Sequence, residues 1–336
     1  GVQNSAYGYR SLAANTTGAN NVAVGNDTLD ANTTASNNTA VGKAALTSNT
    51  TGAANTAVGQ TALATNTTGA DNVAVGKGTL TANTTGAENV GVGSGALGAN
   101  TEGANNIGIG DRAICTNTTG DCNVSIGYKA LAANTTADFN IGIGACSSLA
   151  NTTGTANVAI GAFSLFTSTT GDNNVAIGHD ALFCNNGSSA DNNTAVGHKA
   201  MCKNTTGTKN VAVGKDSLLS NTTGSHNVAI GHLALNDNTT ANQNVAIGDE
   251  ALDVNTTGAD NIAVGTNSLG SNTTAACNVA VGSGALGAVT TAGNNVGIGT
   301  KAGCNITTGS QNTMLGLLTR TNAVGDDNNV VIGGNN

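Results

Sequence analysis

Apolar and polar positions alternate along this chain in a 17-residue unit that is repeated from one end to the other. Each unit contains a run such as NVAVG at 21–25, then a leucine four residues later, then an Asn-Thr-Thr motif. The final glycine of the run recurs at this spacing from Gly8 to Gly333, apart from one step of 19 residues between Gly178 and Gly197. A unit this short cannot bury its own apolar face, so neighbouring units must stack. The pattern predicts an all-β, single-chain β-solenoid (a parallel β-roll or β-helix) of about 20 coils with 17 residues each.

Asparagine stands four residues before the glycine in all 20 units. Stacked coils place equivalent residues about 4.8 Å apart, the usual spacing of paired strands. Side-chain amides at that spacing form hydrogen-bonded ladders, as they do in cross-β structures. We therefore predict a structural ladder rather than a ligand site for these residues, which include Asn21, Asn38, Asn55, Asn72 and Asn89.

The three residues before the glycine have the pattern of a short strand. Their first and third positions are mostly β-branched, which suits a strand, and both point to the same face. If this bulky face fills the coil, it forms the core together with the leucine that follows the glycine. The predicted core residues include Val24, Val41, Ile109, Leu29 and Leu46.

The middle position of the strand is alanine or glycine in almost every unit, so both strand faces are apolar. With the bulky face inside, the small face would run along the outside of the coils. Apolar residues on both faces are typical of a sheet that is covered on both sides. We therefore predict that this stripe contacts another chain, through residues that include Ala23, Ala40, Ala57, Ala74 and Ala212.

The repeat sets the expected domain organisation. Residues 1–316 are predicted to form regular coils, with an insertion near 186–190 that bulges as a surface loop. Residues 317–336 lack the Asn-Thr-Thr motif and are predicted to be an irregular last coil or the approach to a following segment. Neither end carries a recognisable cap, so we expect the protein to continue at one or both ends, or the rods to join end to end.

Composition and charge restrict the partners and the chemistry. The net charge is −8 and the 11 basic residues are scattered, which argues against nucleic acid as a partner. No run of 18 apolar residues is present, so we expect no membrane insertion. No catalytic set recurs, and the glycines at 91–95 lack the lysine and the helix of a nucleotide loop. We predict that the chain is no enzyme and needs no cofactor.

Histidine and cysteine leave narrower alternatives open. His179 and His198 follow the glycine in consecutive units, but no third metal ligand recurs with them, which favours plain surface residues over a metal site. Seven cysteines at scattered positions argue against a disulfide framework, although Cys184 and Cys202 lie in adjacent coils where one bridge is geometrically feasible. The recurrent Asn-Thr-Thr is also a glycosylation sequon, but glycans on every coil would crowd one another, which favours a structural turn.

Motifs such as NTAVG at 55–59 and 193–197, with Asn-Thr-Thr-Gly between copies, resemble tandem repeats of bacteriophage and environmental tail-fibre proteins. They also resemble the head repeats of YadA-like trimeric adhesins, whose unit is shorter. The resemblance covers essentially the whole chain. It implies a left-handed parallel β-roll, three chains side by side, and attachment to host surfaces. No coiled-coil stalk or membrane anchor accompanies the repeats here.

The repeat and the resemblance together favour a non-enzymatic structural rod, such as the shaft of a phage tail fibre or an adhesin. We expect it to be extracellular, on a virion appendage or a cell surface, and to act as a stiff spacer that self-associates and contacts a host receptor or glycan.

The alternative is a subunit of an extracellular filament or sheath that stacks end to end. Ice binding by threonine ladders is disfavoured, because Thr33 and Thr34 lie in a turn and point in different directions.

Overall fold

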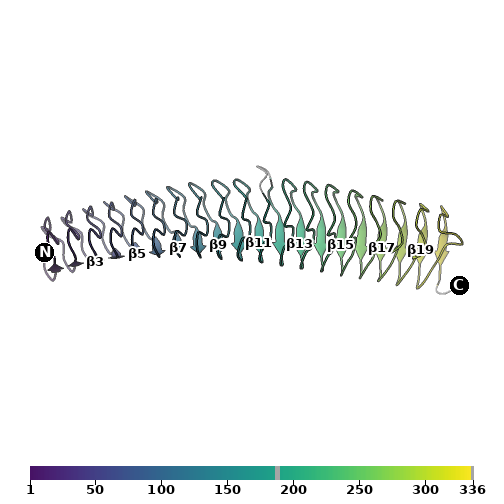
Figure 1. The fold of residues 1–336 in the computed structure, drawn as a ribbon, viewed down its shortest axis with the longest axis horizontal. Helices are drawn as coiled ribbons and strands as arrows, with labels where there is room; N and C mark the ends of the chain where they lie inside the picture. The colour runs from purple at the N-terminus through teal and green to yellow at the C-terminus, as the bar shows by residue number, and fades with distance from the viewer. Residues whose placement is uncertain (186–189, 334–336) are drawn as a thin grey trace. The chain divides into compact units, whose positions relative to one another are not determined.

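The computed structural model describes residues 1–185 and 190–333, and it is a parallel β-solenoid of three-residue strands. The chain forms two compact units, Gly1–Thr170 and Gly171–Asn336. Within each unit the coils follow one another with their strands aligned on one side (Figure 1). The first unit contains β1 (Ser5–Tyr7), β2 (Val22–Val24), β3 (Thr39–Val41), β4 (Thr56–Val58), β5 (Val73–Val75), β6 (Val90–Val92), β7 (Ile107–Ile109), β8 (Val124–Ile126), β9 (Ile141–Ile143) and β10 (Val158–Ile160). The second contains β11 (Val175–Ile177), β12 (Thr194–Val196), β13 (Val211–Val213), β14 (Val228–Ile230), β15 (Val245–Ile247), β16 (Ile262–Val264), β17 (Val279–Val281), β18 (Val296–Ile298), β19 (Thr313–Leu315) and β20 (Val330–Ile332).

Every strand pair within a unit is parallel and joins equivalent residues of successive repeats. In the first unit Ala23 lies opposite Ala40, and in the second Ala195 lies opposite Ala212. The step from β11 to β12 spans 19 residues and still pairs Ala176 with Ala195. The predicted 17-residue β-solenoid is therefore confirmed. Of the insertion predicted near 186–190, residues 186–189 lie outside the described residues, and the division at 316/317 remains a prediction.

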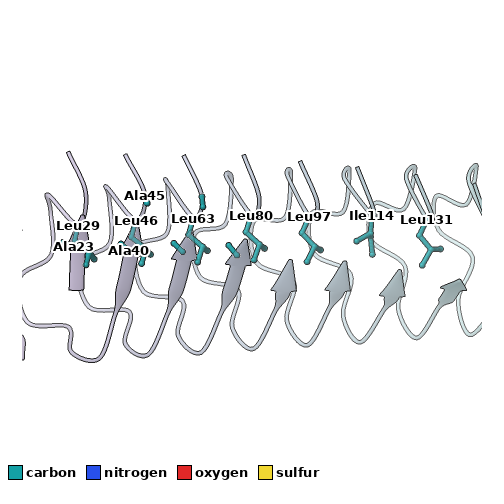
Figure 2. Close-up of a cluster of buried hydrophobic side chains, with 13 residues drawn as sticks. Ala23, Leu29, Ala40, Ala45, Leu46, Leu63, Leu80, Leu97, Ile114 and Leu131 are labelled. Atoms are coloured by element: carbon teal, nitrogen blue, oxygen red, sulfur yellow. The ribbon is translucent and has the colours of Figure 1, made fainter. Parts of the chain in front are cut away.

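The core of each coil is narrow and is filled from the side opposite the strand. In the coils that follow β2 to β18 the residue four positions after the glycine is buried, as predicted for Leu29 and Leu46. Figure 2 shows these side chains in a row alongside the strands of the first unit, with Ala23 and Ala40 next to Leu29 and Leu46. The row comprises Leu29, Leu46, Leu63, Leu80, Leu97, Ile114 and Leu131.

The two strand faces are the reverse of the prediction. Val24, Val41 and Ile109 were predicted to lie in the core, but they point outward and are 38%, 37% and 37% exposed. The middle residue of the strand points inward instead. The leucines from the opposite side leave almost no room there: a Cβ added to Gly91 would lie 2.5 Å from Thr79 Cγ2, and one added to Gly142 would lie 2.9 Å from Leu131 Cγ. The inner position is therefore mostly alanine or glycine, with the buried Ser125 and Met314 as exceptions, and the β-branched residues of the strand face out.

Two features require glycine directly after each strand: its backbone conformation and the closeness of the next coil. At Gly59 φ is +139°, a region that residues with a Cβ rarely adopt. A Cβ at this position would also lie 2.3 Å from the carbonyl oxygen of Gly76. This glycine therefore lets successive coils approach closely at the end of the strand.

Non-glycine residues also adopt left-handed conformations in every regular coil. In the coil of β2 they are Asn20, Asp27 and Leu29, with φ values of 59°, 56° and 49°. Backbone hydrogen bonds between coils hold all three: Asn20 N–H donates to Val2 O at 3.1 Å, Asp27 N–H to Tyr9 O at 2.8 Å and Leu29 N–H to Ala45 O at 3.1 Å. The left-handed conformation is unfavourable for these residues by itself. Hydrogen bonding between coils therefore overrides local preference at these turns.

Candidate functional site

The outward face of the strands is an extended apolar surface in each unit. We call it the outer sheet face and define it as the first and third residues of the strands β2–β10 in the first unit and β11–β18 in the second. It consists of valine and isoleucine, with threonine at 39, 56 and 194. These side chains are half-buried to exposed, and the third-position residues of β3, β4, β5, β7, β11 and β17 are each 37% exposed.

No charged residue lies on the outer sheet face of either unit as defined. The residues just after the glycine are different, because they include exposed polar side chains such as Gln60 and Asp111. The face is thus an apolar band bordered by polar turns. Parallel sheets normally have both faces covered. Here the inner face is covered by the chain itself, whereas the outer face is covered by no segment of the described chain.

The alanine stripe that was predicted to contact another chain cannot do so. Its members are fully buried within the single chain, each at 0% exposure: Ala23, Ala40, Ala57, Ala74 and Ala212. That prediction was wrong because it assumed that the larger side chains fill the coil. The apolar side chains that remain exposed lie on the opposite face of the same strands.

The asparagines before the strands form the predicted ladder, and those from Asn21 to Asn312 are buried. Asn38 N–H donates to Asn21 Oδ1 at 2.9 Å, and Asn55 N–H donates to Asn38 Oδ1 at 2.9 Å. The amide nitrogen of Asn72 donates to Asn55 Oδ1 at 3.1 Å, and Asn89 continues the series on Asn72. Each side chain thus supplies an acceptor for a backbone N–H that begins the next strand. These residues are structural.

The Asn-Thr-Thr motif holds a second ladder, which sequence reasoning treated only as a turn. Asn49 Nδ2 donates to Asn32 Oδ1 at 3.0 Å and to Gly52 O at 2.9 Å, and Asn66 Nδ2 donates to Asn49 Oδ1 at 2.8 Å. These asparagines are fully buried. A glycan on Asn49 would need the nitrogen that makes both of its donor bonds. Burial and these two bonds favour a structural role for the asparagine over glycosylation in the folded coil. The sequence signal for this role was the recurrence of asparagine at the same position of each repeat.

The ladder of the Asn-Thr-Thr motif stops at Asn272, because the next coil has no asparagine at the equivalent position. Asn272 Nδ2 donates to Asn255 Oδ1 at 2.8 Å, but Asn272 Oδ1 is buried without a hydrogen-bond partner. The equivalent residue of the next coil is Val289, which has no donor on its side chain. One valine thus leaves a buried acceptor unpaired, a state that costs about 1–3 kcal/mol.

The two histidines considered in the sequence lie one above the other. The rings of His179 and His198 are stacked, with centroids 5.7 Å apart and an interplanar angle of 20°. Asp180, which sequence reasoning did not consider, brings its Oδ2 to 3.0 Å from His179 Nδ1. The ligand atoms of the three side chains all lie within 4.8 Å of one another.

Cys184 and Cys202 lie on adjacent coils, as expected, and Cys184 N–H donates to Cys202 O at 2.9 Å. Both are free thiols in the structure, so the bridge that the sequence left open is not formed there. Burial raises the pKa of the Cys202 thiol to about 11, with smaller contributions from Cys184 and Asp180. Burial also raises the pKa of Cys184. Because thiolate is the reactive form, both thiols are poor nucleophiles at neutral pH.

Comparison with protein-family models and with curated proteins gives no match for this chain. In the described residues, no helix is long and apolar enough to cross a membrane. The fold class is thus established by the coils themselves: a β-solenoid of 17-residue turns with asparagine ladders.

Proposed function

We propose that this chain is a non-enzymatic structural segment of a fibrous surface protein, such as a phage tail fibre or an adhesin shaft. It acts as a stiff spacer and associates with copies of itself through the outer sheet face. The observation that carries the proposal is the uncharged valine and isoleucine band on a parallel sheet whose other face is already buried.

The repeat period favours a second copy of this chain as the occupant of that face. The side chains of the band are spaced by the distance between coils, about 4.8 Å. Only a surface with the same spacing stays in register with the band over many coils. A copy of this chain has that spacing by construction, so ridges of one band fit the grooves of the other along the whole contact.

The number of side chains in the band is close to that of a stable protein–protein interface. Counting the first and third residues of β2–β10 gives 18 side chains in the first unit alone (nine strands with two each). Stable protein–protein interfaces use about 20–30 residues on each side. The first unit therefore presents nearly enough side chains for a standard interface before its neighbouring turns are counted.

The resemblance to trimeric adhesin heads and tail-fibre repeats favours three chains side by side, left-handed coils and an extracellular setting on a virion or cell surface. A host receptor or glycan is the corresponding external partner. Stiffness follows from the construction, since each coil is bonded to its neighbours by strand pairing and asparagine ladders.

The test is the molar mass in solution of the unmodified chain and of a variant that carries Val58→Lys, Val75→Lys and Ile109→Lys. All three residues are exposed in the single chain, so lysine there leaves the core intact. The matched control is Gln60→Lys, which adds a charge on the exposed turn beside the band. We expect the unmodified chain and the control to have the mass of three chains, and the triple variant that of one.

A single-chain mass for the unmodified protein would overturn the association. Masses that grow without limit, together with long filaments in electron micrographs, would instead support the end-to-end filament. Loss of the β-sheet signal in the circular dichroism of the triple variant would show that the coil had unfolded. In that case each lysine is introduced separately.

A further inference from the structure

We propose that His179, Asp180 and His198 form a binding site for a divalent transition-metal ion of the zinc class, on the surface of the second unit. The two histidines and one carboxylate supply borderline nitrogen and hard oxygen ligands, a set that suits Zn²⁺, Ni²⁺ and Cu²⁺. The proposal does not depend on the proposed structural function.

The register of the coils builds this cluster. His179 and His198 follow the strand-ending glycines of successive coils, and the parallel pairing of β11 with β12 places one above the other. The backbone fixes the two turns together, because Lys199 N–H donates to His179 O at 3.0 Å. The stacked rings then present their nitrogens along the same edge of the solenoid.

Asp180 completes the set from the same turn. Its φ of 57° is left-handed, and its carboxylate lies 3.0 Å from His179 Nδ1. Its side chain is 19% exposed, so it is held more closely than the half-exposed His179. Among the described residues, this is the one group of three histidine, cysteine or acidic side chains whose ligand atoms converge within 4.8 Å.

The geometry needs only a small contraction to hold an ion. Ligand atoms about 2.1 Å from a tetrahedral zinc ion lie about 3.4 Å from one another. The His–Asp pair is already closer than that, and the remaining separations of up to 4.8 Å close by rotation of exposed side chains. A water molecule would take the fourth position, as expected for a site with three protein ligands.

The residues around the site affect its affinity for a cation, and its position indicates what a bound ion would do. Lys199 occupies in the next coil the position that Asp180 occupies, and its positive charge opposes a cation. The site also joins the two coils that the single 19-residue step separates. A bound ion would therefore tie together the pair of coils whose connecting segment is longest.

The experiment is calorimetric titration of the chelator-treated chain with Zn²⁺ alone. The background is Cys184→Ser with Cys202→Ser, which removes the nearest competing thiols. We expect one ion for each chain. The variant His179→Ala with His198→Ala should weaken binding by more than about 100-fold, and Asp180→Asn by at least about 10-fold. Lys199→Ala should strengthen it.

The matched control is His232→Ala. His232 also follows a strand-ending glycine, but it meets only one carboxylate, with its Nδ1 2.9 Å from Asp249 Oδ1. Its loss should leave zinc binding unchanged. Hydrogen exchange supplies a second readout: Zn²⁺ at 100 times its dissociation constant should slow exchange from the open state of these two coils by about 100-fold. Equal binding by the double-histidine variant and its parent, or no binding by the parent, would overturn the proposal.

Discussion

Removing one rung of the first asparagine ladder should open the solenoid locally. Asn72 is fully buried, and its side chain joins three coils. Its Nδ2 donates to Asn55 Oδ1 at 3.1 Å and to Gly86 O at 2.9 Å, while its Oδ1 accepts from the backbone N–H of Asn89 at 3.0 Å. In Asn72→Ala the N–H of Asn89 loses its acceptor inside the protein.

The magnitude follows from these bonds. A buried donor left without a partner costs about 1–3 kcal/mol, and a lost side-chain hydrogen bond about 1 kcal/mol. Gly86 O keeps a second donor, Asn83 Nδ2 at 2.9 Å, so it adds no unpaired group. The total is about 2–4 kcal/mol. Because each coil contacts only its neighbours, this loss should fall on the coils around β5 and β6.

Native-state hydrogen exchange followed by mass spectrometry measures this loss directly. Amides in these coils should exchange between about 30-fold and about 700-fold faster, the equivalent of 2–4 kcal/mol. The control is Asn26→Ala, an exposed asparagine whose one side-chain bond within residues 1–185 and 190–333 accepts from Tyr9 N–H at 3.4 Å. It should change exchange little. Equal rates in Asn72→Ala and the unmodified protein would refute the reasoning that buried ladder bonds hold the coils together.

Three other predictions follow from particular contacts. Asn272→Val should destabilise the chain by about 1–3 kcal/mol less than Asn83→Val in denaturant titration, because Asn272 Oδ1 is already unpaired; equal losses would contradict this. Thr61→Gly should raise stability by about 0.5–1 kcal/mol, since it relieves a left-handed φ of 57°, and an unchanged melting temperature would count against that reason. Cys202 is half-buried and its pKa is raised to about 11, so it should react with iodoacetamide at pH 8 far more slowly than the exposed Cys122 and should accelerate as the pH approaches 11; equal rates of the two thiols would contradict the raised pKa.

The sequence predicted the repeat architecture because periodicity constrains it strongly. The 17-residue phase determined which residues stack, and both the burial of Leu29 and the ladder through Asn38 followed from it. The second ladder, through Asn49, was equally periodic, but its residue type is also common in turns. Periodicity located this ladder without revealing that its side chains are buried.

The orientation of the strand was beyond sequence reasoning. Alternation separates the face of Val24 from the face of Ala23, but it does not say which face is inside. The usual preference for bulky residues in the core gave the wrong answer, because the width of the coil decides the matter. That width depends on how far Leu29 reaches across from the opposite side, which is a tertiary property. The same holds for His179 and Asp180, whose convergence depends on a left-handed turn.

Cryo-electron microscopy of the purified protein at side-chain resolution would show whether the outer sheet face joins copies of this chain, as we propose. We expect density for several chains side by side, with Val75 and Ile109 of one copy packed against the outer sheet face of another. Single chains with this face open to solvent, or copies that meet only through the turns on other sides of the coil, would contradict it.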